Sequence, residues 1–278
     1  MNRREAFKQI AAKAAKGELA FPTSAEVALK IQRAMDDPDC PLDRAAKLVQ
    51  TEPLLAARVV AIANSVTYNR SGRKITDVRT AVARLGFRTL RTLATALVTR
   101  QMAGTPTDPA LKKYAADLWE HTAHVAALSS IIARRVSHLD PETALFAGVV
   151  HEVGGFYLIS LAKDYPGILE GEPADWVEEG EKEISQAVLK ALEVPEPVME
   201  AVDTLLLGFM ALPPVTLGDT LLLADDLAPV ESPLRHSPSQ TREDPRGRID
   251  AVIGEDTLVS ILEESAAEVE SLIAALRF

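Results

Sequence analysis

A histidine and a glutamate stand side by side in the apolar segment ALFAGVVHEVGG, as His151 and Glu152. An imidazole next to a carboxylate in such a segment indicates a metal or phosphate site, because both side chains supply ligand atoms. A working hydrolytic site also needs three or more ligands at fixed distances and an open position for water. The pair marks a candidate site and does not by itself establish its chemistry.

Small residues share the face of the predicted helix on which His151 lies: Ala144, Ala147, Gly148 and Gly155. Such a face lets a neighbouring helix approach closely. A buried histidine there can hydrogen-bond across the helix pair, as buried polar groups normally do. We favour this structural role for His151 over metal binding.

A short basic loop supplies a second set of candidate binding residues, Arg70, Arg73 and Lys74. Cations and backbone amides beside a helix start can bind phosphate or an acidic partner. A solvated loop in an acidic protein explains the same charges and is the favoured interpretation. We find no phosphate-cradling glycine loop, no zinc-type cysteine spacing and no serine-nucleophile elbow.

The composition limits the possible classes of protein. The chain has 278 residues, 47% of them hydrophobic, and a net charge of −10, which argues against nucleic acid or anionic lipid as the main partner. The longest uncharged stretch, 204–218, contains Pro213 and Pro214 and is not expected to span a membrane. A single cysteine, Cys40, excludes an internal disulfide and fits a reducing cytoplasm, where we expect the protein to be.

Helical start and stop signals recur along the chain, and no alternating strand pattern stands out. The sequence therefore predicts an all-α fold, a compact multi-helix bundle without significant sheet. In the segment 108–137, Leu111, Leu118, Val125 and Ile132 repeat every seven residues, which places His121 on the buried side. One predicted helix starts at Glu26. The others span 53–64, 77–85, 88–102, 108–137, 141–163, 181–192, 195–210, 217–227 and 255–277.

These elements predict four parts of the chain. Residues 1–18 form an N-terminal helix, and 19–227 form the main helical domain. Residues 228–250 are polar and proline-bearing and are predicted to be a mobile loop. Residues 251–278 form a C-terminal helix that packs on the same domain.

Five stretches, in this order, carry a resemblance to a known family: FPTSAEVALKIQ, LVQTEPLLAARVVAIANSVTY, ITDVRTAVARLGFRTLR, LWEHTAHVAALSSIIA and PETALFAGVVHEVGGFYL. Together they resemble the HDOD family, the regulatory branch of the HD superfamily of metal-dependent phosphohydrolases, over roughly residues 19–227. The positions that match the family signature, and to which the resemblance assigns structural roles, are Glu52, Pro53, Asn64, Ser65, Leu85 and Gly86.

The resemblance implies an all-α domain with a regulatory role, usually without demonstrated catalysis. In the catalytic superfamily a histidine, a histidine–aspartate pair and a later aspartate hold divalent metal. Carried over, these positions fall on His121 and on His151 with Glu152, whereas the later aspartate finds no match. A histidine frequent in related domains is replaced near Glu181, and Gly155 stands where catalytic relatives often have a lysine. The set looks vestigial, so we expect no cofactor and no catalytic residue.

The leading hypothesis is a non-enzymatic, bacterial signal-transduction module that binds another signalling protein. One alternative is a metal-dependent phosphohydrolase with His121, His151 and Glu152 as divergent ligands. Another is a sensor that binds a nucleotide, such as a cyclic dinucleotide, without turnover. Neither a membrane nor a nucleic acid is an expected partner.

Overall fold

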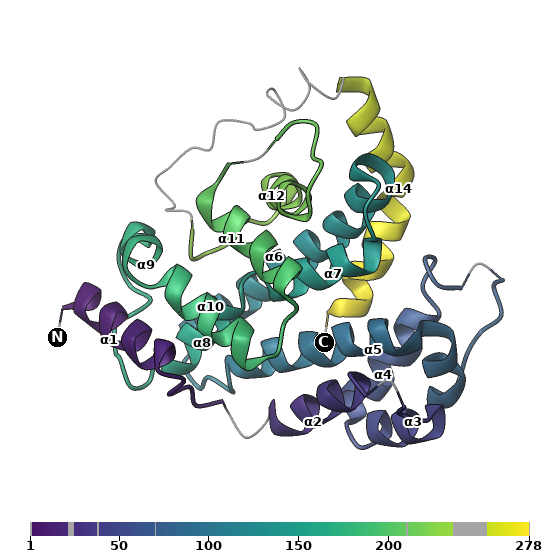
Figure 1. Cartoon of the computed structure of the whole chain (residues 1–278), viewed down its shortest axis with the longest axis horizontal. Helices are drawn as coiled ribbons and strands as arrows, with labels where there is room; N and C mark the ends of the chain where they lie inside the picture. The colour runs from purple at the N-terminus through teal and green to yellow at the C-terminus, as the bar shows by residue number, and fades with distance from the viewer. Residues whose placement is uncertain are drawn as a thin grey trace.

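Helices account for the regular structure of the described part of the chain, which confirms the all-α prediction there (Figure 1). The computed structural model describes residues 2–21, 25–37, 39–69, 71–209, 211–235 and 255–277, and no strand occurs among them. The elements are α1 (Arg3–Ala15), α2 (Glu26–Met35), α3 (Leu42–Gln50), α4 (Pro53–Ala63), α5 (Val78–Met102), α6 (Pro109–Ile132), the π-helix η2 (Ala133–Ser137), α7 (Pro141–Val150), α8 (Val153–Leu161), α9 (Pro173–Glu179), α10 (Glu181–Ala191), α11 (Glu196–Leu207), α12 (Leu217–Leu227) and α14 (Glu255–Leu276).

Acidic side chains fix where several helices begin. Asp108 and Asp140 precede α6 and α7, and each carboxylate accepts a hydrogen bond from an amide of the first turn. A carboxylate at this position satisfies an amide that has no partner inside the helix and interacts favourably with the helix dipole. Glu52 does the same for α4 by accepting from the Leu54 amide, and Pro53 is the first residue of that helix.

The remaining signature residues end or bend helices. Asn64 follows α4, and its side-chain amide both donates to the Ile75 carbonyl and accepts from the Ile75 amide, at 2.8 Å each. Ser65 and Leu85 are buried. Gly86 lies inside α5 with φ 75° and ψ 171°, a conformation that favours glycine, and kinks the helix where two separate helices are predicted.

Two further departures from the predicted helices occur, and the first of them bears on the site. The stretch 141–163 is not one helix, because a turn at His151 and Glu152 separates α7 from α8. In addition, α3 and α9 occur where no helix is predicted; neither has a side-chain hydrogen bond at its start, so no capping signal marks them. The His151–Glu152 pair therefore lies at a corner between two core helices.

One stretch, Pro141–Leu161, is long and apolar enough by composition to cross a membrane. It comprises α7 and α8, and 89% of its most apolar window is buried inside the protein. Such burial is typical of the core of a helical domain.

The long helix α6 runs through the middle of the molecule (Figure 1). It packs against α7, α12 and α14, while α5 packs against α2, α3 and α4, and α1 lies on α9 and α10. The C-terminal helix α14 is held to this body by a hydrogen bond from Trp119 Nε1 to the Leu276 carbonyl, 3.0 Å, and by an ion pair between Arg134 and Glu268.

The helices α6 and α7 approach each other closely at Gly148. A Cβ atom at this position would lie 2.3 Å from Ala126 Cα, closer than any real contact of that kind. The small-residue face predicted around His151 therefore does allow a neighbouring helix to approach.

We expect Gly148→Ala to lower the free energy of unfolding by about 1–3 kcal/mol, because the added methyl group meets backbone that cannot move aside. Urea denaturation followed by circular dichroism measures the change. Ala116→Leu, which enlarges an exposed position of α6, is the control and should stay within about 0.5 kcal/mol of the wild type. Equal midpoints for both variants would contradict the close approach.

The mobile loop predicted from residue 228 onward does not begin there. Residues 228–235, which we call the strap, continue from α12 with Ser232 and Leu234 buried. Because residues 228–250 are polar as a whole, their composition did not indicate that Ser232 and Leu234 would be buried. The rest of the predicted loop, 236–250, lies outside the described residues.

Candidate metal centre

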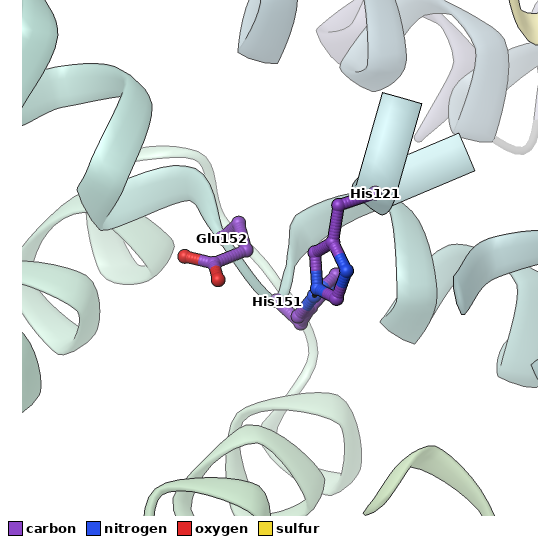
Figure 2. Close-up of side chains that lie close together, drawn as sticks. All are labelled: His121, His151 and Glu152. Carbon is purple, nitrogen blue, oxygen red and sulfur yellow. Dashed lines mark hydrogen bonds between the residues drawn. The ribbon is translucent and has the colours of Figure 1, made fainter. Parts of the chain in front are cut away.

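Three helices bring two histidines and an aspartate together. His121 comes from the middle of α6, His151 follows α7, and Asp225 lies in the last turn of α12. The side chains of His121 and His151 meet (Figure 2), with their Nε2 atoms 3.1 Å apart. Asp225 Oδ1 lies 3.1 Å from His121 Nε2 and 3.9 Å from His151 Nε2. The three residues are buried, with exposed fractions of 2%, 3% and 6%.

Backbone carbonyls fix the orientation of both imidazoles. His121 Nδ1 lies 2.7 Å from the Val230 carbonyl, and His151 Nδ1 lies 2.7 Å from the Gly148 carbonyl. A carbonyl can only accept, so we assign a proton to each Nδ1. The Nε2 lone pairs of the neutral rings then face each other, and a proton or a cation between them is needed to remove the repulsion.

The pKa values of the two histidines shift in opposite directions. Burial alone lowers the pKa of His121, but the adjacent Asp225 carboxylate, with help from Glu152, raises it above its ordinary value. Burial and the neighbouring His121 lower the pKa of His151 to about 3. Burial raises the pKa of Asp225, but the two histidines and Arg235 lower it by a larger amount. The net shift is downward, so this carboxylate is ionised. Of the two imidazoles, His121 therefore holds a proton at Nε2 more readily than His151 does.

The donor atoms also fit a divalent cation. Metal bonds of about 2.1 Å place neighbouring ligand atoms roughly 3 Å apart. Both separations from His121 Nε2 are 3.1 Å, whereas the one between His151 Nε2 and Asp225 Oδ1 is longer, 3.9 Å. That oxygen is buried and receives no well-aligned hydrogen bond despite its short distance to His121. His121, His151 and Asp225 would hold the ion through two imidazole nitrogens and one carboxylate oxygen, and both Nδ1 contacts supply the outer support that metal-binding histidines use.

Glu152 has a different environment from the aspartate. It offers a carboxylate oxygen within 4.8 Å of the ligand atoms of His121 and His151. Its Oε1 accepts a hydrogen bond of 2.6 Å from Ser232 of the strap. Figure 2 shows the carboxylate turned to the side of the histidine pair rather than between the rings. Glu152 therefore lies beside the centre, and we do not assign it as one of the ligands.

The sequence shows no match for the later aspartate, but the structure places Asp225 beside the two histidines. A signal was present in the segment LLLADDL: Asp225 follows Leu221 by one helical turn on the buried side of a largely apolar helix. Ionised carboxylates are almost never fully buried without a partner. The set of ligands is thus less eroded than the sequence indicated.

The strap covers the centre and contacts its residues directly. It supplies the Val230 carbonyl to His121 and the Ser232 hydroxyl to Glu152. A Cβ on Gly155 would lie 2.2 Å from Leu234 Cδ1, so the strap fills the space beside this glycine. The absence of a lysine at Gly155 thus coincides with a leucine packed against that position.

The last residues of the strap form hydrogen bonds with residues outside the centre. Arg235 Nε donates to Glu181 Oε1 at 2.8 Å, and the Tyr114 hydroxyl donates to the Pro233 carbonyl at 2.8 Å.

Tyr114 also lines a cavity of about 670 Å³ between the start of α6 and the end of α8. A second cavity, of about 250 Å³, lies between α5, α7 and α11. Neither cavity is lined by the histidines or by Asp225.

The predicted phosphate-binding loop does not join the centre. Arg73 and Lys74 are exposed between α4 and α5, and Arg70 lies outside the described residues. The Asn69 side chain donates to the Arg73 carbonyl at 3.0 Å and shapes the turn. The centre is built instead by α6, α7, α8 and α12 with the strap.

Comparisons with known proteins give one family and several solved structures of similar fold. A model of the HDOD domain matches residues 21–204. A provisionally named metal-dependent phosphohydrolase from Shewanella amazonensis SB2B has 22% identity and a TM-score of 0.77, with all of both chains covered. An HDOD domain protein of unknown function from Geobacter sulfurreducens has 24% identity, 98% coverage of both chains and a TM-score of 0.61.

A provisionally named signal transduction protein from Marinobacter aquaeolei VT8 has 20% identity and a TM-score of 0.63, covering 99% of this chain and 66% of the other. At these identities the structures establish a shared fold. No protein with a curated description matches the chain.

Proposed function

Because the chain belongs to the HDOD family, we propose that it is a regulatory module of signal transduction. It acts through contacts with another protein and does not hydrolyse a substrate at the His121–His151–Asp225 centre. The name of the Marinobacter aquaeolei protein supports the signalling role. The contacts around the centre support the absence of turnover.

Closure of the centre is the observation that carries the proposal. Hydrolysis needs a position for water and substrate beside the metal ligands. Here the strap occupies the adjoining space with Ser232 and Leu234, and the three centre residues are nearly inaccessible. A substrate could reach them only after the strap had left. In the closed state the centre joins α6, α7 and α12 and stabilises the module.

An exposed apolar loop supports action through protein contacts. Phe209 is 82% exposed, and Leu207 and Val215 nearby are also exposed. Leu207 ends α11, and the backbone next to Val215 is fixed by Asp219, whose carboxylate accepts from the amides of Ala211, Val215 and Thr216. Several large apolar side chains exposed close together in sequence are typical of contact sites.

We expect purified protein supplied with Mn²⁺, Mg²⁺, Fe²⁺ or Zn²⁺ to leave bis(p-nitrophenyl) phosphate, nucleotides and cyclic dinucleotides intact, because no substrate can approach the closed centre. Product release followed by chromatography measures this directly. A rate above background that disappears in His151→Ala, but persists in the exposed-loop variant Lys74→Ala, would overturn the proposal.

A second candidate function is metal-dependent phosphohydrolysis, and the position of Asp225 favours it. A bound divalent cation would supply Lewis-acid chemistry toward a phosphoryl oxygen. His121, His151 and Asp225 would hold the ion, and the strap would have to open to admit substrate. The name of the Shewanella amazonensis protein is consistent with this candidate.

Elemental analysis separates the candidates at their first step. The phosphohydrolase requires about one equivalent of metal or more, lost in His151→Ala, and a melting temperature that rises when metal is added to stripped protein. Metal without turnover would leave the regulatory module with a structural ion. A protein with no bound metal, whose melting temperature does not rise on adding metal, would exclude the second candidate.

A further inference from the structure

The cavity between the start of α6 and the end of α8 has the size of a small-molecule site. Its volume is about 670 Å³, and such sites usually measure about 300–1,000 Å³. Residues from two segments, 103–114 and 159–170, line it. Most of its wall is aliphatic, formed by Ala103, Leu111, Ile159, Ala162, Ile168 and Leu169. A wall of this kind favours the aliphatic part of a ligand over water.

Two hydroxyl groups lie among these aliphatic side chains. Ser160 Oγ donates to the Tyr157 carbonyl at 2.6 Å, and the Tyr114 hydroxyl donates to the Pro233 carbonyl at 2.8 Å. Both protons are therefore engaged within the protein, whereas each hydroxyl oxygen keeps lone pairs that can accept. The polar group that fits such a wall is a donor, such as the hydroxyl of an alcohol.

The charged side chains at the cavity do not select a charged ligand. Asp108 precedes α6 and accepts from the Ala110 amide, and its charge is balanced by the positive end of that helix. Lys163 and Glu170 also line the cavity, and both are exposed to solvent. Their charges are opposite and are screened by water and salt. We therefore expect an uncharged ligand.

Tyr114 connects this cavity to the strap. Its side chain lines the cavity, and the carbonyl that its hydroxyl contacts belongs to Pro233, between the buried Ser232 and Leu234. A ligand packed on the tyrosine restricts the motion of that side chain. The hydroxyl then stays on the Pro233 carbonyl, and the strap stays in place.

We propose that this cavity binds a small, uncharged, mainly aliphatic molecule with a hydroxyl group, and that Tyr114 transmits its binding to the strap. The bound molecule holds the strap closed over the His121–His151–Asp225 centre. The proposed function includes a protein partner and no small molecule, so this site goes beyond it and depends only on the cavity and on the contacts of the strap.

The first test measures binding of 1-octanol to the full-length protein through displacement of the neutral fluorescent probe N-phenyl-1-naphthylamine. Octanol is expected to displace the probe better than octanoate or octylammonium, which have the same chain with a negative or a positive charge. Ala162→Phe should weaken octanol binding by at least about tenfold, because its ring takes the space of the aliphatic chain. The control Ala266→Phe, at an exposed position of α14, should leave it within about twofold of the wild type.

Thr105→Trp fills the same cavity from the other segment. Because Thr105 is exposed, this variant keeps the test decisive if Ala162→Phe does not fold. Octanol binding that the folded cavity variants leave unchanged overturns the proposal. So does the absence of octanol binding to the wild type, or tighter binding of octanoate or octylammonium.

The second test is hydrogen exchange of residues 228–235, measured by mass spectrometry. Octanol should slow their exchange in the wild type, with a limit of about tenfold at ten times its Kd. Tyr114→Phe, measured at its own saturating concentration, should lose this slowing, because the phenyl ring has no hydroxyl to hold the strap. The control Tyr165→Phe removes a hydroxyl that accepts from Lys13 Nζ and should keep it.

Two outcomes of the exchange experiment overturn transmission through Tyr114. One is exchange of the strap that octanol does not slow in the wild type, and the other is slowing that persists in Tyr114→Phe. Neither test measures turnover or binding of a protein partner, so failure of this proposal is distinct from failure of the proposed function.

Discussion

Asp225→Ala is expected to lower the free energy of unfolding by about 3–5 kcal/mol, the range for removing one member of a buried charged pair. The substitution leaves His121 Nε2 without the carboxylate that lies 3.1 Å from it. The imidazole then lacks the carboxylate that favours its protonation, and its Nε2 lone pair faces that of His151. Urea denaturation at neutral pH, followed by tryptophan fluorescence and circular dichroism, measures the loss.

Two controls separate the charge from other effects of this substitution. Asp225→Asn keeps the shape without the charge and should retain only part of the lost stability. Glu200→Ala, on the exposed side of α11, should change it by less than about 0.5 kcal/mol. If Asp225→Ala is as stable as the wild type, the carboxylate does not bind the histidines in solution.

A chain ended after residue 254 is expected to be largely unfolded. The missing helix α14 buries Leu272, Ile273 and Leu276 against α6 and α4. Each such side chain contributes about 1.5–3 kcal/mol, and a typical domain is stable by only about 5–15 kcal/mol in total. Removal also leaves Trp119 Nε1 without its carbonyl partner. Circular dichroism and hydrogen exchange of the truncated protein test this expectation.

Arg277→Ala is the matched control for the truncation. It removes an exposed ion pair with Glu120 and leaves the apolar face of α14 in place, so it should cost less than about 1 kcal/mol. A truncated protein that unfolds with the wild-type midpoint would show that α14 is dispensable for the domain.

Local signals were sufficient to predict most of the helices and two of the residues at the centre. The seven-residue repeat placed His121 inward, and the small-residue face placed His151 against a neighbouring helix. The corner at Glu152 was not predicted because the stretch around it is uniformly apolar, and periodicity cannot locate a break in such a stretch.

Contacts distant in sequence explain what was missed. Asp225 becomes a candidate ligand only when α12 packs on α6, and neither helix alone indicates that pairing. Arg235 and Ser232 lie in a segment whose polar composition is typical of a solvated loop, although their partners Glu181 and Glu152 are buried. Composition describes the average environment of a segment and does not reveal the few contacts that fix it.

The position of the strap along the chain has a consequence for how such domains diverge. The match to the family ends at residue 204, whereas Asp225 and the strap follow it. The residues that decide whether the histidines are sealed or accessible therefore lie outside the region by which relatives are recognised. Exchange of this short downstream segment would change how accessible the histidines are, while the recognisable domain stayed the same.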